Sequence, residues 1–145
     1  MLAEQIAAAF STRENPGAVL VELVGDLGGG KTAFVKAMAK ALGIEATITS
    51  PTFTIHQRYN IPDSDGYLEH FDLYRLDNDD IVLNEVQDAL SNPHSIICIE
   101  WGQHFAALSD LDRLTIKFEY VDDAHRKVTL ASHGSYYQKL LETIQ

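Results

Sequence analysis

The chain has 145 residues, of which 46% are hydrophobic and 22% charged, a composition that predicts one globular domain over residues 1–145. Its net charge of −10 has the wrong sign for a protein that holds nucleic acid by neutralising phosphates. The acidity fits either a solubility feature or a face that meets a basic partner. No apolar run is long enough to cross a membrane and no basic signal-peptide region begins the chain, so we expect a cytoplasmic protein without membrane contact.

The first half of the chain alternates helical and extended patterns. Apolar spacing predicts a helix at residues 2–10, a buried strand at 18–24 and a helix at 33–42 that ends before Gly43. Alternating β-branched residues predict a strand at 47–55, and a turn at 60–66 joins it to a returning strand at 67–74. These two strands are expected to form a hairpin.

The second half is richer in strands. We expect a helix at 81–90, strands at 95–100, 114–120 and 127–131, and a terminal helix at 136–144. An early strand, loop and helix followed by β-rich segments predicts an α/β sandwich whose central sheet is mixed and partly antiparallel.

The loop between the strand at 18–24 and the next helix carries the strongest signal. Residues 25–32 read Gly-Asp-Leu-Gly-Gly-Gly-Lys-Thr, a complete Walker A motif. Its glycines let backbone N–H groups converge on phosphate oxygens, Lys31 reaches the β and γ phosphates, and the Thr32 hydroxyl binds Mg²⁺. The motif therefore predicts a three-layer fold of the P-loop NTPase type. The expected nucleotide contacts here are Gly25, Asp26, Leu27, Gly28, Gly29, Gly30, Lys31, Thr32 and Ala33.

Two acidic residues could complete such a site. Glu100 ends an apolar strand, and the carboxyl end of a buried strand faces the crevice where α/β sheets bind ligands. It could also be a strand-end carboxylate in solvent, although its position favours a functional role. Asp72 interrupts an apolar and aromatic segment, and burying it unpaired is unfavourable. Either a metal ion or the neighbouring Arg75 would relieve that penalty, and the residues alone favour neither.

Other candidates have a simpler structural interpretation. The segment at 50–53 is placed where P-loop proteins keep a switch that senses the γ-phosphate, or it is a strand that follows a proline kink. Trp101 is either a core residue or a nucleotide contact. Cys98, the single cysteine, is expected in the core, and the scattered histidines predict no zinc site. The acidic stretch at 63–66 lacks the later ligands of a calcium loop and is expected to be a turn.

Several separated segments resemble the TsaE family of small bacterial ATPases. They are the Walker A motif, Thr-Ser-Pro-Thr-Phe at 49–53, His-Phe-Asp-Leu-Tyr-Arg-Leu at 70–76 and Ile-Glu-Trp at 99–101. The resemblance implies an ATPase that binds ATP or ADP with Mg²⁺ and is needed for the threonylcarbamoyladenosine modification of tRNAs reading codons that begin with A. It implies TsaD and TsaB as partners, with tRNA met only through their complex.

The resemblance also assigns roles to residues. Lys31 and Thr32 would contact phosphate and Mg²⁺, Glu100 would be the Walker B-type acid, and Asp72 a second acid at the metal. By the same resemblance Thr52 would belong to a switch-like loop, and Trp101 and Arg126 would approach the nucleotide. The chain departs from the family in two ways, because it starts close to its first helix and because Gly102-Gln103 stands where proline and an acidic or amide residue are usual.

Three other functions share the phosphate loop. A small-molecule kinase fits the length, but the strands expected at 114–131 occupy the place of Arg-bearing lid helices. A GTPase would carry an Asn-Lys-x-Asp signature, which the chain lacks. A binding module gated by the nucleotide stays open. For an ATPase, the absence of a clearly placed arginine finger predicts slow basal turnover that depends on the partner.

Overall fold

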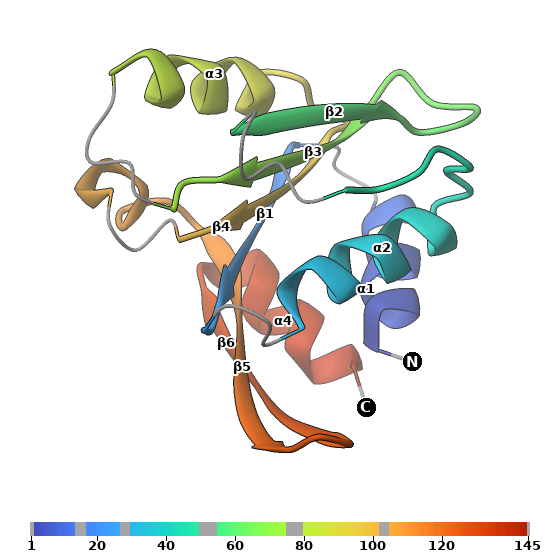
Figure 1. Ribbon diagram of the computed structural model, residues 1–145. Coiled ribbons are helices and arrows are strands. Elements are labelled where there is room, and N and C mark those ends of the chain that lie inside the picture. The colour runs from blue at the N-terminus through green and yellow to red at the C-terminus, as the bar shows by residue number, and fades with distance from the viewer. Residues whose placement is uncertain are drawn as a thin grey trace.

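The computed structural model describes residues 2–13, 17–26, 30–49, 55–74, 80–101 and 105–144. The helices and strands follow one another in the predicted order (Figure 1), except that the strand expected at 47–55 begins at His56 and that the 3-10 helix was not predicted. The elements are α1 (Leu2–Ser11), β1 (Val19–Val24), α2 (Lys31–Ala41), β2 (His56–Asn60), β3 (Tyr67–Asp72), α3 (Asp80–Leu90), β4 (Ile96–Glu100), the 3-10 helix η2 (Ala106–Leu108), β5 (Arg113–Asp122), β6 (His125–His133) and α4 (Ser135–Thr143).

The strands form one twisted sheet in the order β2-β3-β4-β1-β5-β6. The pairs β3–β4, β4–β1 and β1–β5 are parallel. The two outer strands are antiparallel to their neighbours, β2 to β3 and β6 to β5. All five residues of β4 are buried, as expected of a parallel strand covered on both faces. The prediction of a mixed, partly antiparallel sheet is confirmed.

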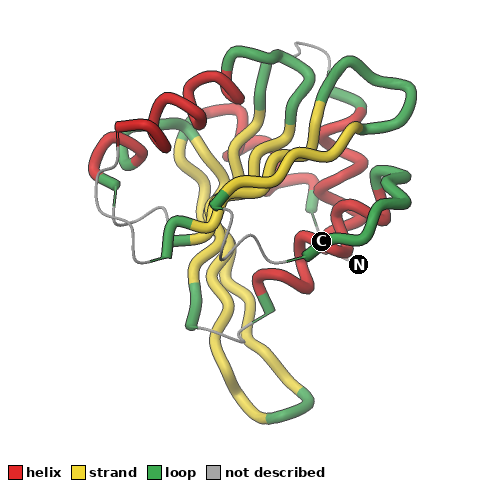
Figure 2. The backbone as a smooth tube through the Cα atoms, turned by 45° about the horizontal axis from the view of Figure 1, so that its top comes forward, coloured by secondary structure: helices red, strands yellow, loops and turns green. Residues whose placement is uncertain are grey.

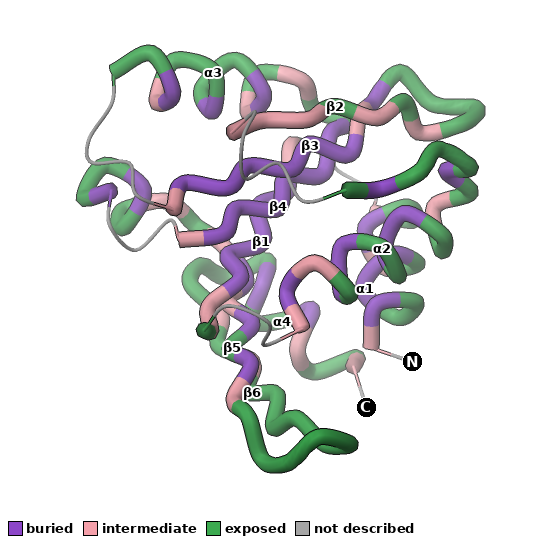
Figure 3. The backbone as a smooth tube through the Cα atoms, in the orientation of Figure 1, coloured by how far each residue is buried: buried purple, intermediate pink, exposed green. Residues whose placement is uncertain are grey.

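Helices cover both faces of the sheet, which gives three layers (Figures 1 and 2). Apolar residues of α1, α2 and α4 form one core with alternate residues of the inner strands. The opposite face packs against α3 and η2 in a second core. Figure 3 shows that burial is concentrated in the strands β3, β4 and β1 between these layers. No helix in the part of the chain that the structure describes is long and apolar enough to cross a membrane.

The strand predicted at 47–55 is wrong in its position. Residues 47–49 are not extended in a ladder, and the pairing with β3 starts at His56. Ile55 has a φ of 68°, a left-handed conformation that interrupts a strand. Thr49 instead approaches β2 through its side chain, whose hydroxyl accepts a hydrogen bond from the Gln57 amide at 3.1 Å. The predicted hairpin exists, but its first strand is β2.

The hairpin of β5 and β6 extends past the rest of the sheet. The last pair between β1 and β5 is Val24 with Lys117, while β5 and β6 stay paired as far as Asp122 and His125. The projecting end is exposed in Figure 3. It extends from the edge of the sheet at which β1 ends.

The terminal helix satisfies a backbone N–H group near the start of β1. The Tyr137 hydroxyl of α4 accepts a hydrogen bond from the Leu20 N–H at 2.9 Å. Leu20 precedes Val21, where the pairing of β1 with β5 begins. Tyr137 is 4% exposed, so its hydroxyl is the hydrogen-bond acceptor for a backbone N–H that has little access to water.

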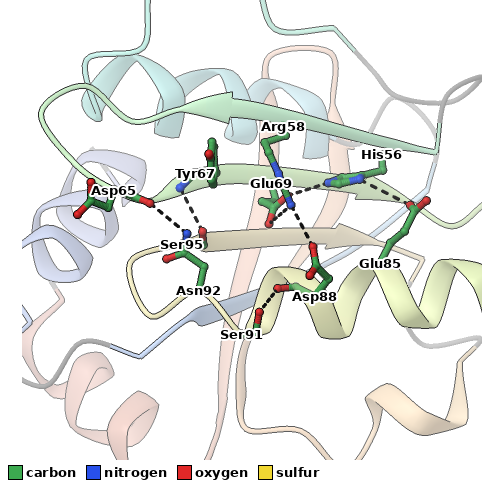
Figure 4. A network of polar contacts seen from close by, with 10 residues as sticks. All are labelled: His56, Arg58, Asp65, Tyr67, Glu69, Glu85, Asp88, Ser91, Asn92 and Ser95. Carbon is green, nitrogen blue, oxygen red and sulfur yellow. Dashed lines mark hydrogen bonds and ion pairs between the residues drawn. The ribbon is translucent and has the colours of Figure 1, made fainter.

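A polar network lies between β2, β3 and α3, on the face opposite α2 (Figure 4). Its centre is Glu69 of β3, which is fully buried. His56 Nε2 lies 2.9 Å from Glu69 Oε1, and Arg58 Nε donates to the same oxygen at 2.7 Å. Burial raises the pKa of Glu69, but the hydrogen bonds from His56 and Arg58 outweigh it and hold the pKa below its usual value.

Candidate nucleotide site

Three parallel strands end at the same edge of the sheet and bring the predicted acids together. Asp72 is the last residue of β3 and Glu100 the last residue of β4, and the two are directly opposed in the ladder. Leu23 of β1 pairs with Glu100 on its other side. Gly25 and Asp26 follow β1 at this edge. The register of the sheet therefore places both carboxylates beside the start of the phosphate loop.

Helix α2 begins at this edge with its first amides uncapped by a side chain. Gly30 occupies the N-cap with a φ of 109°, a conformation that glycine adopts without strain. Because glycine has no side-chain oxygen, the N–H groups of the first turn keep their hydrogen-bonding capacity for an anion. Thr32 and Ala33 lie in that turn, Thr32 half-buried and Ala33 exposed.

Phe118 of β5 fixes how close the loop lies to the sheet. A Cβ atom on Gly25 would lie 2.7 Å from the Phe118 carbonyl oxygen, and one on Gly30 would lie 3.4 Å from the Phe118 ring. Phe118 also packs against Phe34 of α2 with ring centroids 6.0 Å apart. Gly25 is therefore required for this approach of the loop to β5.

Lys31 is buried at the centre of the site. Its Nζ atom donates a hydrogen bond to the Gly25 carbonyl at 2.6 Å and lies 3.9 Å from Glu100 Oε1. Burial lowers the pKa of Lys31, and the carboxylates of Glu100, Asp72 and Asp26 oppose that shift. A buried ammonium held among acids in this way can move to a phosphate without leaving the site.

The two oxygens of Glu100 face different partners. Oε1 faces Lys31, whereas Oε2 lies 2.6 Å from Nε2 of His70. His70 and Glu100 are both buried, at 0% and 4% exposure. Cys98 is opposite His70 in the ladder, and burial raises the pKa of its thiol to about 12, so it brings no charge to this pair. Cys98 belongs to the core, as its sequence context predicts.

Asp72 is 6% exposed and has a hydrogen bond within its own turn. Its Oδ1 atom accepts a bond from the Tyr74 N–H at 3.0 Å. The backbone here is tied to both neighbours, because the Asp72 N–H donates to Ile55 O at 2.8 Å and the Leu73 N–H to Glu100 O at 3.0 Å. The turn thus fixes the carboxylate beside β4. Arg75, the alternative partner that the sequence offers, lies outside the described residues.

Trp101 forms one wall of the site. Its φ is 65°, a conformation that is uncommon for a non-glycine residue and turns the chain immediately after Glu100. The ring lies against Tyr74, with centroids 5.0 Å apart, and the Lys31 ammonium lies 3.9 Å from its centre. Trp101 is thus half-buried beside the lysine and also borders the core under α3.

Of the other predicted residues, several are not described by the structure, and Arg126 lies elsewhere. Leu27, Gly28, Gly29 and Thr52 lie outside the described residues, as do 50–54 of the switch-like segment. Arg126 lies in the exposed hairpin, where it donates to Asp122 O at 2.6 Å and has its guanidinium over the Tyr120 ring at 4.7 Å. The structure therefore brings together Lys31, Asp72 and Glu100, with Gly25, Asp26, Gly30, Thr32 and Trp101 around them, and shows Arg126 bound within its hairpin.

The residues present fit a magnesium nucleotide. The uncapped start of α2 and the Lys31 ammonium suit phosphate oxygens, while the Thr32 hydroxyl and the carboxylates of Asp72 and Glu100 are the oxygen donors that Mg²⁺ prefers. Among the described residues, no three His, Cys, Asp or Glu side chains are grouped so as to hold a metal ion by themselves.

Comparison with known proteins identifies the family. The family model for threonylcarbamoyl adenosine biosynthesis protein TsaE matches residues 2–128. The chain belongs to the TsaE family. The tRNA threonylcarbamoyladenosine biosynthesis protein TsaE of Bacillus subtilis is 35% identical over 142 residues, covering 97% of this chain and 84% of that protein. The TsaE of Treponema pallidum is 37% identical over 116 residues, covering 79% and 82%.

A solved structure supports the same assignment. The crystal structure of YdiB from Bacillus subtilis matches with a TM-score of 0.71 and 30% identity, covering 97% of this chain and 84% of YdiB. The TsaE-family chain therefore has the predicted P-loop NTPase-type fold. The resemblance read from the motifs is confirmed at the level of the family and the fold.

Sequence reasoning missed two residues that shape the TsaE site. Phe118 was expected only as part of a strand, although its alternation with Leu114 and Ile116 marks the face that points to α2. His70 was quoted within a family segment but received no role. Its signal was its place two residues before Asp72, since alternate residues of a strand share a face.

Proposed function

We propose that this TsaE-family protein is a magnesium-dependent ATPase that supports the threonylcarbamoyladenosine modification of tRNAs reading codons that begin with A. It would act in the cytoplasm with TsaD and TsaB, and meet tRNA through their complex. The observation that carries the ATPase proposal is the buried Lys31 at the uncapped start of α2, 3.9 Å from Glu100 at the end of β4. The names of the relatives support the link to tRNA modification.

The chain's own groups suggest how hydrolysis would proceed. Lys31 and the first amides of α2 would bind the phosphates and stabilise the charge that develops on them. Glu100 would orient the attacking water or hold its proton, and Asp72 and Thr32 would bind the metal with it. When bound, Mg²⁺ would supply neutralising charge to the phosphate oxygens. Trp101 would limit the access of solvent to Lys31.

A low basal rate is expected from the same geometry. Lys31 is bonded to the Gly25 carbonyl and lies near Glu100 and Trp101, so these contacts compete with phosphate. Arg126 is held inside the hairpin by Asp122 and Tyr120. Binding of TsaD and TsaB would order the site and complete it, which makes turnover dependent on the partner.

The test is a reconstitution with purified TsaD and TsaB. ATP hydrolysis and multiple-turnover tRNA modification are measured with and without this chain, and we expect this chain to stimulate both. The variants Lys31→Ala and Thr32→Ala should lower hydrolysis by at least about 100-fold. Lys36→Ala, an exposed lysine on the same helix, is the matched control and should keep the rate. Full hydrolysis in either site variant would refute the assignment.

The same preparation separates the alternative functions. Phosphate transferred to a small metabolite, in place of phosphate released to solution, would identify a kinase. If the modification needs only ATP binding, a non-hydrolysable analogue will support repeated turnover, and the chain is then a nucleotide-gated binding module. Affinity for TsaD–TsaB measured with ATP, ADP and the analogue distinguishes control of docking from a requirement for hydrolysis.

A further inference from the structure

His70 lies next to Glu100, on the same face of β3 as Asp72. Its ring is fully buried, and Nε2 is 2.6 Å from Glu100 Oε2. Glu100 Oε1 is the oxygen that faces Lys31 at 3.9 Å. One carboxylate oxygen is therefore engaged by the histidine, and the other faces the position of the lysine. A carboxylate held at one oxygen cannot rotate freely about its last bond.

The surroundings of the ring define which nitrogen carries the proton. A carboxylate only accepts hydrogen bonds, so Nε2 of His70 is the donor. Nδ1 is buried and has no hydrogen-bond partner among the described residues. The geometry therefore places a proton on Nε2, directed at Glu100 Oε2.

We propose that His70 is a positioning residue that fixes the Glu100 carboxylate, with Oε2 bound to the ring and Oε1 presented to Lys31 and the reacting phosphate. This inference rests on the proposed ATPase function. In the absence of the Nε2–H donor, Oε2 would be a buried acceptor that could turn toward Lys31 and withdraw the lysine from phosphate. His70 would then affect the rate of the chemical step more than the affinity for nucleotide.

Two substitutions separate this role from simple packing. His70→Gln places an amide N–H near the position of Nε2, whereas His70→Leu keeps a side chain of similar volume and has no donor. Glu69→Gln is the matched control, because Glu69 is the preceding residue, is equally buried, and points into the network of Figure 4 on the opposite face of the sheet. Thermal unfolding of each variant checks that it is folded.

Steady-state hydrolysis in the complex with TsaD and TsaB gives the first measurement. We expect His70→Leu to lower kcat about 10- to 100-fold and to leave KM for ATP within about twofold. His70→Gln should recover most of the rate, and Glu69→Gln should keep it. A wild-type kcat in His70→Leu would overturn the proposal. Equal losses in His70→Leu and His70→Gln would also overturn it, because the loss would then follow from packing.

Nitrogen-15 NMR of the histidine rings gives a second measurement, in the nucleotide-free protein. The signals lost in His70→Leu identify the ring, and we expect its Nε2 to carry a proton that is hydrogen-bonded to Glu100. An Nε2 atom without a proton would overturn this inference alone. Absence of hydrolysis in the wild-type complex would overturn the ATPase proposal, while the ring signals would still decide the contact, so the two failures are distinguishable.

Discussion

The Lys31 ammonium lies 3.9 Å from the centre of the Trp101 ring and the same distance from Glu100 Oε1. One buried cation thus contacts an aromatic face and approaches a carboxylate that ends the neighbouring strand. Both contacts come from adjacent residues at the end of β4. Any ligand that draws Lys31 toward itself must change the environment of the indole.

This relationship predicts a fluorescence signal. Trp101 is the only tryptophan of the chain, so its emission reports this site alone. We expect ADP with Mg²⁺ to change the intensity or wavelength of emission, because Lys31 leaves the ring when it binds phosphate. Lys31→Met should remove the response, and the exposed Lys36→Met should retain it. An unchanged emission at saturating nucleotide, verified by calorimetry, would contradict the prediction.

Gly25→Ala is expected to destabilise the fold and weaken nucleotide binding. The new Cβ would lie 2.7 Å from the Phe118 carbonyl oxygen, so either the loop or β5 must shift. Such overpacking reduces the free energy of unfolding by about 1–3 kcal/mol, which urea denaturation would measure. Gly17→Ala is the control, since a Cβ at Gly17 meets nothing within 4 Å. Equal stability of the two variants would show that the loop accommodates the methyl group.

Glu69 predicts a pH dependence of stability. Its pKa in the folded protein is held below the ordinary value of 4.5, so the unfolded chain binds the proton more readily. The stabilisation by charged Glu69 is therefore complete above about pH 4.5 and is lost as the pH falls through the lower, folded pKa. Glu69→Gln should lose this dependence, so the stability difference between wild type and variant should shrink below that pH.

Urea denaturation at a series of pH values from neutral to acidic would measure the effect of Glu69. Glu45→Gln removes an exposed carboxylate of the same type and serves as the control. Its stability difference from the wild type should show little change with pH. A Glu69→Gln curve parallel to the wild type throughout would contradict the prediction and indicate that the network with Arg58 persists when Glu69 is protonated.

Tyr137→Phe removes the acceptor for the Leu20 N–H and leaves that group buried. The lost hydrogen bond should reduce the free energy of unfolding by about 1–3 kcal/mol. Tyr136→Phe, at the neighbouring and more exposed position, is the matched control and should change stability less. Comparable reductions of the free energy of unfolding in both variants would show that the hydrogen bond to Leu20 does not contribute to stability as predicted.

The local elements were predictable because each depends on a short pattern. The apolar run of β1 and the glycines beside Lys31 predicted a strand, a loop and a helix in that order, and the structure contains the strand β1 followed by the helix α2. The prediction of a strand at 47–55 is wrong for a local reason that residue periodicity does not show. Ile55 adopts a left-handed conformation, and β2 begins only where His56 reaches Glu69.

The arrangement of the site was predictable only in part. That Asp72 and Glu100 end strands could be inferred from the sequence, but their direct opposition depends on the order and register of β3 and β4. The same register brings His70 to Glu100 across 30 residues of sequence. No local pattern encodes such a pairing, which is why His70 received no role.

Gly25, at the start of the phosphate loop, lies against Phe118, in the strand that continues into the projecting hairpin. A movement of Gly25 toward β5 would press on the Phe118 carbonyl, and in the described sheet β5 pairs with β1 only as far as Lys117 and continues beyond it with β6 alone (Figure 2). We expect such a movement to shift the turn between β5 and β6. A spin label at Ala124, in the exposed turn between β5 and β6, would therefore record events at the loop from a distance.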